Sequence, residues 1–156
     1  MCKIKIATDS TADIPKDLCE KWNISVLPLT IIHEGNEYCD GIDISKENFY
    51  QILETSQRLP TSSQVTVNMY TELFNRCRED GYTDLIQVTL NSKGSGTYQA
   101  AELAKALCFE SHPEAIDEFR IHMYWLNGDA EAGNVFFGEE AEILSNSNWQ
   151  DVQKNN

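Results

Sequence analysis

The sequence predicts an α/β fold with a mostly parallel sheet and helices on both faces. The order strand, polar loop, helix occurs near the N-terminus, at about residues 3–22, and again at about residues 84–109. This alternation is typical of parallel sheets whose strands are joined by helices. The chain has 156 residues, of which 41% are hydrophobic, so it has the length of one ordinary domain and enough apolar side chains for a core.

In the first half of the chain, apolar and polar residues alternate from Lys3 to Thr8, which predicts a strand that ends in a polar loop. Pro15 suits the first turn of a helix, and Ser45 is a natural N-cap for another. A run of β-branched residues predicts a further strand that Pro28 interrupts. The expected elements are a strand over 3–8, a helix over about 16–22, a strand over 24–32, a turn over 34–37, a short strand over 37–39 and a helix from Ser45 to about 54.

The second half contains the best candidate for a buried strand, which is the apolar run Asp84–Leu90. The other expected elements are a loop over 59–64, a helix over about 67–78, a helix over about 98–109 and a strand over 119–123. Beyond Tyr124 the pattern indicates only a helix around 139–144. We therefore divide the chain into an α/β domain over 1–123 and a divergent, poorly ordered tail over 124–156.

Composition excludes several classes of function. With 25 acidic and 12 basic side chains the formal charge is -13, which argues against nucleic-acid binding. No apolar run reaches the length of a membrane span, and the N-terminus does not resemble a signal peptide, so we expect a cytoplasmic protein. The five cysteines are scattered and odd in number, which favours free thiols, and nothing recommends a metal site at His112 or His122.

Three loops rich in hydroxyl groups are the candidate functional features; we call them the rim loops. They are Thr8–Thr11, Thr61–Gln64 and Ser92–Thr97. In an open α/β sheet ligands bind at the carboxyl ends of the strands, and the third loop precedes a helix whose N-terminus favours an anion. These loops therefore suit a carboxylate or a phosphate, although helix capping alone explains Ser and Thr at such positions about equally well. The Walker and dinucleotide fingerprints both fail at the third loop.

Catalysis is not predicted. The histidines His33, His112 and His122 lie far in sequence from the serines of the rim loops, so no nucleophile and base are paired. Asp9, beside Ser10, is expected to cap its own turn. The sequence therefore predicts no catalytic residues.

Five segments in order resemble the DegV family of bacterial proteins. Pro60–Gln64 is similar to the family's P-x-T-S-Q segment, with Ser62 in place of the usual threonine. Asn91–Gln99 is similar to its S-S-x-x-S-G-T-Y-Q segment, with Asn91 in place of the first serine. The other matching segments are Lys3–Pro15, Ile24–Leu29 and Tyr38–Tyr50, so the resemblance covers residues 3–123 and predicts the fold of a DegV N-terminal domain.

The resemblance implies a protein that binds a long-chain fatty acid and has no other cofactor. Family members bury the acyl chain between two domains, hold its carboxylate with hydroxyl groups, and in some cases present it to a fatty-acid kinase. Carried onto this chain, Ser62 and Ser92 are the expected carboxylate ligands. Ser95 and the backbone of Gly96 support them, and Ser10 closes the site.

Two departures from the family pattern qualify this expectation. The family has about twice this length, so the basic and histidine residues of its second domain are missing here, and the sequence after Met123 no longer follows the family. A face that normally meets the second domain would then be exposed and apolar, which favours a homodimer. The alternatives are an enzyme module that handles phosphate at Ser92–Thr97 and a domain remnant without a ligand.

Overall fold

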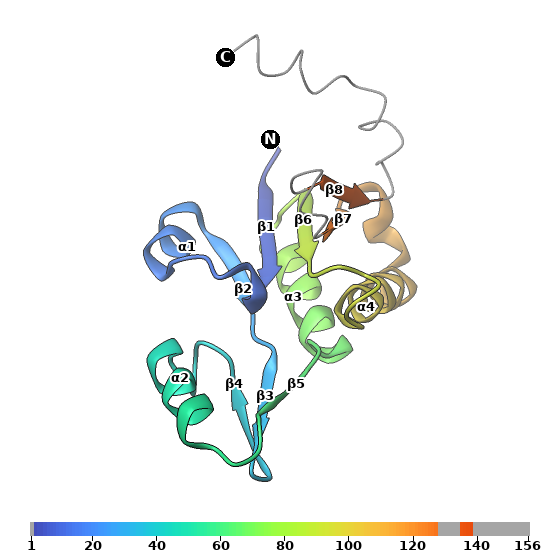
Figure 1. Ribbon diagram of the computed structural model, residues 1–156. Helices are drawn as coiled ribbons and strands as arrows, with labels where there is room; N and C mark the ends of the chain where they lie inside the picture. The colour runs from blue at the N-terminus through green and yellow to red at the C-terminus, as the bar shows by residue number, and fades with distance from the viewer. Residues whose placement is uncertain (1, 128–134, 139–156) are drawn as a thin grey trace.

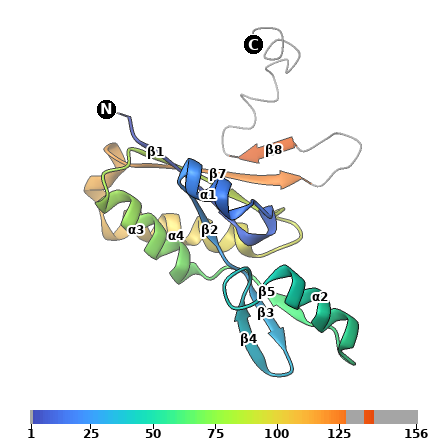
Figure 2. The ribbon, with the colours of Figure 1, turned by 90° about the vertical axis from the view of Figure 1, so that its left-hand side faces the viewer.

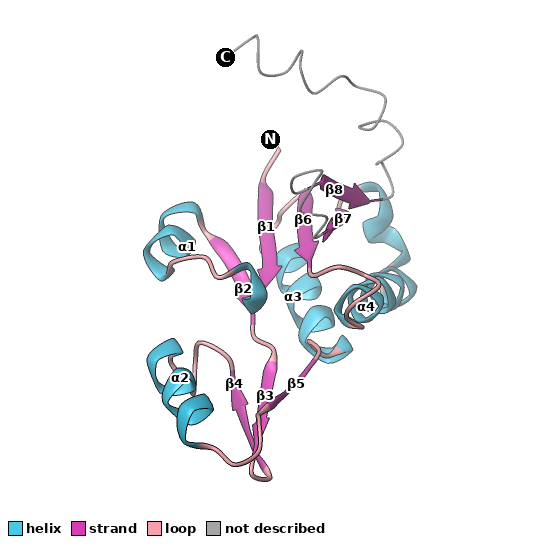
Figure 3. Ribbon diagram, in the orientation of Figure 1, coloured by secondary structure: helices cyan, strands magenta, loops and turns pink. Residues whose placement is uncertain are grey.

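A computed structural model describes residues 2–127 and 135–138. Its main sheet has the strand order β2-β1-β6-β7-β8, in which β8 alone runs antiparallel to its neighbour. Helices join the parallel strands (Figures 1 and 3). The predicted α/β class with a mostly parallel sheet is confirmed. The strands of this sheet are β1 (Ile4–Asp9), β2 (Ile24–Leu27), β6 (Asp84–Thr89), β7 (Arg120–Asn127) and β8 (Val135–Gly138).

A small lobe is inserted between β2 and the next long helix. It contains a three-stranded antiparallel sheet of order β4-β3-β5 and one helix, and it lies beyond the carboxyl ends of β1 and β6 (Figure 1). Its elements are β3 (Thr30–His33), β4 (Asn36–Cys39), α2 (Lys46–Thr55) and β5 (Thr61–Ser63). The insertion places β5 immediately before the helix that returns the chain to the main sheet.

The helices begin where capping residues predict. The Ser45 hydroxyl accepts a hydrogen bond from the Asn48 backbone N–H at 3.2 Å, and Thr66 caps the next helix by accepting from the Met69 N–H at 3.3 Å. The remaining helices are α1 (Lys16–Trp22), α3 (Val67–Glu79) and α4 (Thr97–Ser111), with the short 3₁₀ helices η1 (Ser10–Ala12) and η2 (Pro113–Asp117).

The core lies between the main sheet and the pair α3 and α4, which pack on one face of it (Figure 2). Tyr70 and Phe74 of α3 are fully buried, and the alanines of α4 allow that helix to approach closely. On the opposite face of β1, Ile4 and Ile6 remain 54% and 41% exposed, because α1 packs beside β2 and leaves them uncovered. One face of the sheet is therefore much better covered than the other.

Four sequence expectations differ from the structure. The strand expected over 24–32 is two strands in different sheets, because Pro28 ends β2 and the chain turns into the lobe. The loop expected over 59–64 contains β5, which pairs with β3. The last expected strand continues to Asn127, and β8 was not expected. The helix expected around 139–144 lies outside the described residues.

The described residues meet neither the requirements of a membrane-spanning helix nor those of a metal site. None of their helices is long and apolar enough to cross a membrane. No cluster of three or more His, Cys, Asp or Glu side chains among them has the arrangement of a metal site. All five cysteines lie in the described part of the chain and are free thiols.

Candidate ligand-binding site

The Asp9 carboxylate links the first rim loop to Leu90, the residue that follows β6 and lies just before the third rim loop. This buried carboxylate accepts a hydrogen bond from the Thr11 backbone N–H at 3.0 Å and also bonds the Thr11 hydroxyl, so it caps its own turn as expected. The other carboxylate oxygen accepts from the Leu90 backbone N–H at 2.8 Å, 81 positions along the chain. This second contact fixes the carboxyl end of β6 beside that of β1. Spacing in the sequence gives no signal for it.

Gln64 joins the second rim loop to the third. The Gly96 backbone approaches the Gln64 side chain so closely that a Cβ at position 96 would lie 1.7 Å from Oε1. Gly96 is the N-cap residue of α4, so Gln64 lies against the beginning of that helix. Gln64 therefore brings the second and third rim loops together, and Asp9 ties the first rim loop to Leu90, just before the third.

Two of the predicted serines have hydroxyl groups with structural partners. The Ser10 hydroxyl accepts a hydrogen bond from the Leu29 backbone N–H at 3.0 Å, which ties η1 to the start of the lobe. The Ser95 hydroxyl lies 2.9 Å from the Thr97 hydroxyl and accepts from the Thr97 backbone N–H at 3.2 Å. Both groups stabilise the local backbone of the rim loops.

The other two predicted serines have hydroxyl groups that no neighbouring group in the described residues engages. Ser62 is exposed on β5, where it pairs through the backbone register with Ile31. Ser92 is half-buried, and its backbone carbonyl accepts a hydrogen bond from the Gln99 side-chain amide at 2.9 Å. That bond orders the loop while leaving the Ser92 hydroxyl available to a ligand.

Lys93 of the third rim loop and Tyr70 of α3 differ in exposure and in charge. Lys93, in the third loop, is exposed and has no ion-pair partner in the described part of the chain. The ring of Tyr70 on α3 is fully buried, and burial, with a smaller contribution from Asp9, raises the pKa of its hydroxyl above the ordinary range. Tyr70 is therefore a neutral packing residue, whereas Lys93 supplies a positive charge on the third rim loop.

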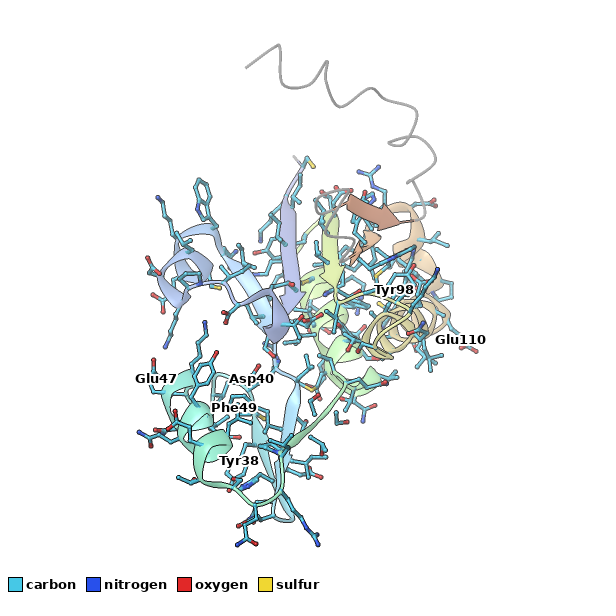
Figure 4. The ribbon with its side chains drawn as sticks, viewed as in Figure 1. Tyr38, Asp40, Glu47, Phe49, Tyr98 and Glu110 are labelled. Carbon is cyan, nitrogen blue, oxygen red and sulfur yellow. The ribbon has the colours of Figure 1, made fainter. Side chains whose placement is uncertain are left out.

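An aromatic pair lies at the α4 end of the site. The rings of Tyr98 and Trp125 meet edge to face with their centroids 4.8 Å apart, and Tyr98 is labelled in Figure 4. Trp125 lies opposite Thr89 in the register of β6 and β7, near the carboxyl edge of the sheet. Sequence reasoning missed Trp125 as a neighbour of the site because it follows Met123, where the resemblance ends.

A cleft of about 700 Å³ lies elsewhere, between α1 and the loop that precedes α2. Of the five predicted site residues only Ser10 lines it. An ion pair between Asp13 and Lys46 crosses from η1 to α2, and Asp40, labelled in Figure 4, lies on the lobe side. The structure therefore brings Ser95 and Gly96 next to the Gln64 end of the second loop and places Ser10 partly in a separate cleft.

None of the three histidines, all of which lie in the described residues, bonds a rim-loop serine. His33 is hydrogen-bonded to Ser56 at 2.8 Å. His112 lies 3.2 Å from the Arg78 guanidinium, and His122 lies 3.1 Å from the Asp84 carboxylate. In the described residues, the rim-loop serines thus have no histidine as a hydrogen-bond partner.

The fold and the rim loops define an α/β domain with hydroxyl-rich loops at the carboxyl edge of a parallel sheet. The chain belongs to the DegV family, described as uncharacterised proteins, whose model matches residues 3–123. A DegV domain-containing protein of Caldanaerobacter subterraneus is 41% identical over 117 residues, covering 75% of this chain and 41% of the relative. A second DegV domain-containing protein, from Clostridium acetobutylicum, is 37% identical over 121 residues, which cover 78% of this chain and 43% of that relative. The chain thus spans about two fifths of the length of these relatives.

The fold of the chain is also similar to that of several solved structures. The chain is similar to a stearic acid-binding protein of Eubacterium ventriosum, with a TM-score of 0.69 and 29% identity over 77% of this chain and 40% of that one. It is also similar to a Thermotoga maritima protein described as revealing fatty acid binding function (TM-score 0.64, 30% identity, 79% and 42% covered). A third is the fatty acid binding protein DegV of Bacillus subtilis (TM-score 0.66, 27% identity, 78% and 40% covered).

Proposed function

We propose that this chain binds a long-chain fatty acid and holds its carboxylate at the rim loops. The observation that carries the proposal is that the hydroxyls of Ser62 and Ser92 have no intramolecular partner in the described residues, on two loops that meet where Gln64 lies against Gly96. Each hydroxyl can donate one hydrogen bond to a carboxylate oxygen. The fatty acids bound by similar solved proteins support this choice of ligand.

The remaining predicted residues have supporting roles in the proposal. Ser95 and the backbone of Gly96 shape the third loop, and Ser10 fixes the first loop against the lobe. The exposed ammonium group of Lys93 attracts the carboxylate against a chain charge of -13. Most of the affinity comes from the acyl tail, since each buried CH₂ contributes about 0.8 kcal/mol.

The proposal is for a binding protein without a cofactor or catalytic residues of its own. The engagement of all three histidines away from the rim loops supports this. We further propose that the bound carboxylate is presented to a fatty-acid kinase in the cytoplasm, the compartment that the sequence predicts. The exposure of Ser62 supports access of a second protein to the head group.

Substitution of the two free serines tests the head-group assignment. Ser62→Ala and Ser92→Ala are each expected to raise the Kd for stearate about tenfold, because each removes a hydrogen bond to a charged group worth about 1.5 kcal/mol or more. Titration calorimetry measures the Kd, and a melting temperature within about 2 °C of the wild type shows that the fold is kept.

Ser63→Ala is the matched control, because successive side chains of a strand point to opposite faces and Ser63 follows Ser62 on β5. It is expected to leave the Kd unchanged. Equal affinities for all three variants and the wild type would overturn the head-group assignment.

A further inference from the structure

Gly96 is distinguished by a close approach and not by its backbone angles. Its φ of -73° and ψ of 0° are accessible to any L-residue. A Cβ at this position would lie 1.7 Å from Oε1, 2.7 Å from Cδ and 3.2 Å from Nε2 of Gln64. By contrast, a Cβ at Gly94 in the same loop would meet only the Asn91 carbonyl oxygen, at 3.9 Å. The absent side chain of Gly96 therefore makes room for the amide of Gln64.

The Gln64 amide has hydrogen-bonding capacity that the described residues leave unused. Gln64 is exposed, and neither its Oε1 nor its Nε2 atom has a hydrogen-bond partner there. Its backbone is held, because Val65, the next residue, is fully buried in the core. The close approach to Gly96 thus places the amide of Gln64, with two unused N–H donors, at the beginning of α4.

We propose that Gln64 is a further ligand of the fatty-acid carboxylate, donating from Nε2, and that Gly96 is the positioning residue that seats it. This inference rests on the proposed function and deepens it. A carboxylate offers about four acceptor positions, which Ser62 and Ser92 alone do not fill. An amide donor on the second rim loop, held against the third, completes the head-group site across both loops.

A double-mutant cycle on Gln64 and Gly96, with the Kd for stearate as the measured quantity, tests the proposal. Gln64→Ala removes the donor, and Gly96→Ala displaces the flexible end of Gln64 from its seat while leaving the donor present. Each is expected to raise the Kd for stearate about tenfold, and the double variant is expected to raise it no further than either single one. Gln51→Ala, which removes a side-chain amide at an exposed position of α2 outside the rim loops, is the matched control and keeps the wild-type Kd.

The melting temperatures of all variants are measured in parallel, and Gln64→Ala, at an exposed position, is expected to leave them unchanged. A Kd unaffected by Gln64→Ala, or effects of the two substitutions that multiply to about a hundredfold, would overturn the role of Gln64. If the wild type binds stearate and only the Ser62 and Ser92 variants weaken it, the proposed function stands and this inference fails. If the wild type does not bind stearate, both fall.

Discussion

At the scale of single residues, the structure distinguishes serine hydroxyls that have hydrogen-bond partners from serine hydroxyls that have none in the described residues. Ser10 and Ser95 each satisfy a backbone N–H, whereas the hydroxyls of Ser62 and Ser92 have no partner in the described residues. Sequence reasoning selected all four because it responds to residue type and loop position. It could not separate them, since the partners Leu29 and Thr97 are identified only by the folded geometry.

Asp84 gives the clearest pH dependence at this scale. The Arg120 guanidinium, which donates to both carboxylate oxygens at 2.8 and 3.1 Å, lowers the pKa of Asp84 well below its usual range, and His122 adds to the shift. A carboxyl whose folded pKa is depressed stabilises the fold above its unfolded pKa of about 3.9 and loses that contribution as the pH falls toward the folded value.

We therefore expect Asp84→Asn to lower the free energy of unfolding by about 1–2 kcal/mol at pH 7, allowing for solvent at the exposed guanidinium. The wild type should then lose stability more steeply than this variant between about pH 5 and pH 2. Urea denaturation at a series of pH values measures both curves. Asp117→Asn, at an exposed position with no hydrogen-bond or ion-pair partner among the described residues, is the control. Parallel curves for the wild type and Asp84→Asn would contradict the prediction.

At the scale of elements, local patterns predicted the helices better than the small strands. The helix bounds at 16–22 agree with α1, and Ser45 caps α2 as expected, because apolar spacing and capping are properties of adjacent residues. Residues 61–63 were expected to be a loop because they are short and polar; they form β5 only by pairing with Ile32, Ile31 and Thr30. Such long-range pairing leaves no mark in a single sequence.

We expect the hydrogen bond from the Leu29 backbone N–H to the Ser10 hydroxyl to stabilise the junction between β2 and β3. Ser10→Ala leaves the backbone N–H of Leu29, a residue only 8% exposed, without its acceptor. The expected cost is about 1–2 kcal/mol in the free energy of unfolding, measured by urea denaturation. Ser62→Ala should change this quantity by less than about 0.5 kcal/mol. If the two substitutions cost the same, the assignment of a structural role to Ser10 is wrong.

At the scale of the whole molecule, the main sheet has one well-covered face and one poorly covered face. Ile4, Ile6 and Val26 are 54%, 41% and 38% exposed. We propose that this face mediates a homodimer, because a contiguous exposed apolar surface favours association. How the sheet is covered depends on the whole fold, so the individual exposed residues could not be identified from sequence.

Sedimentation velocity tests the dimer. The wild type is expected to sediment increasingly as a dimer as its concentration rises, whereas Ile6→Lys, which places a charge on the face, should remain monomeric. Leu59→Lys is the control, because Leu59 is 74% exposed and belongs to the loop between α2 and β5. A strict monomer at all concentrations would contradict the proposal.

Native mass spectrometry of the purified chain, followed by analysis of its organic extract, tests the central claim most directly. The account predicts one fatty acid per chain, released intact on extraction, because the rim loops hold a carboxylate while the tail provides affinity. A chain that carries no fatty acid, and that still binds none after incubation with excess stearate, would contradict it.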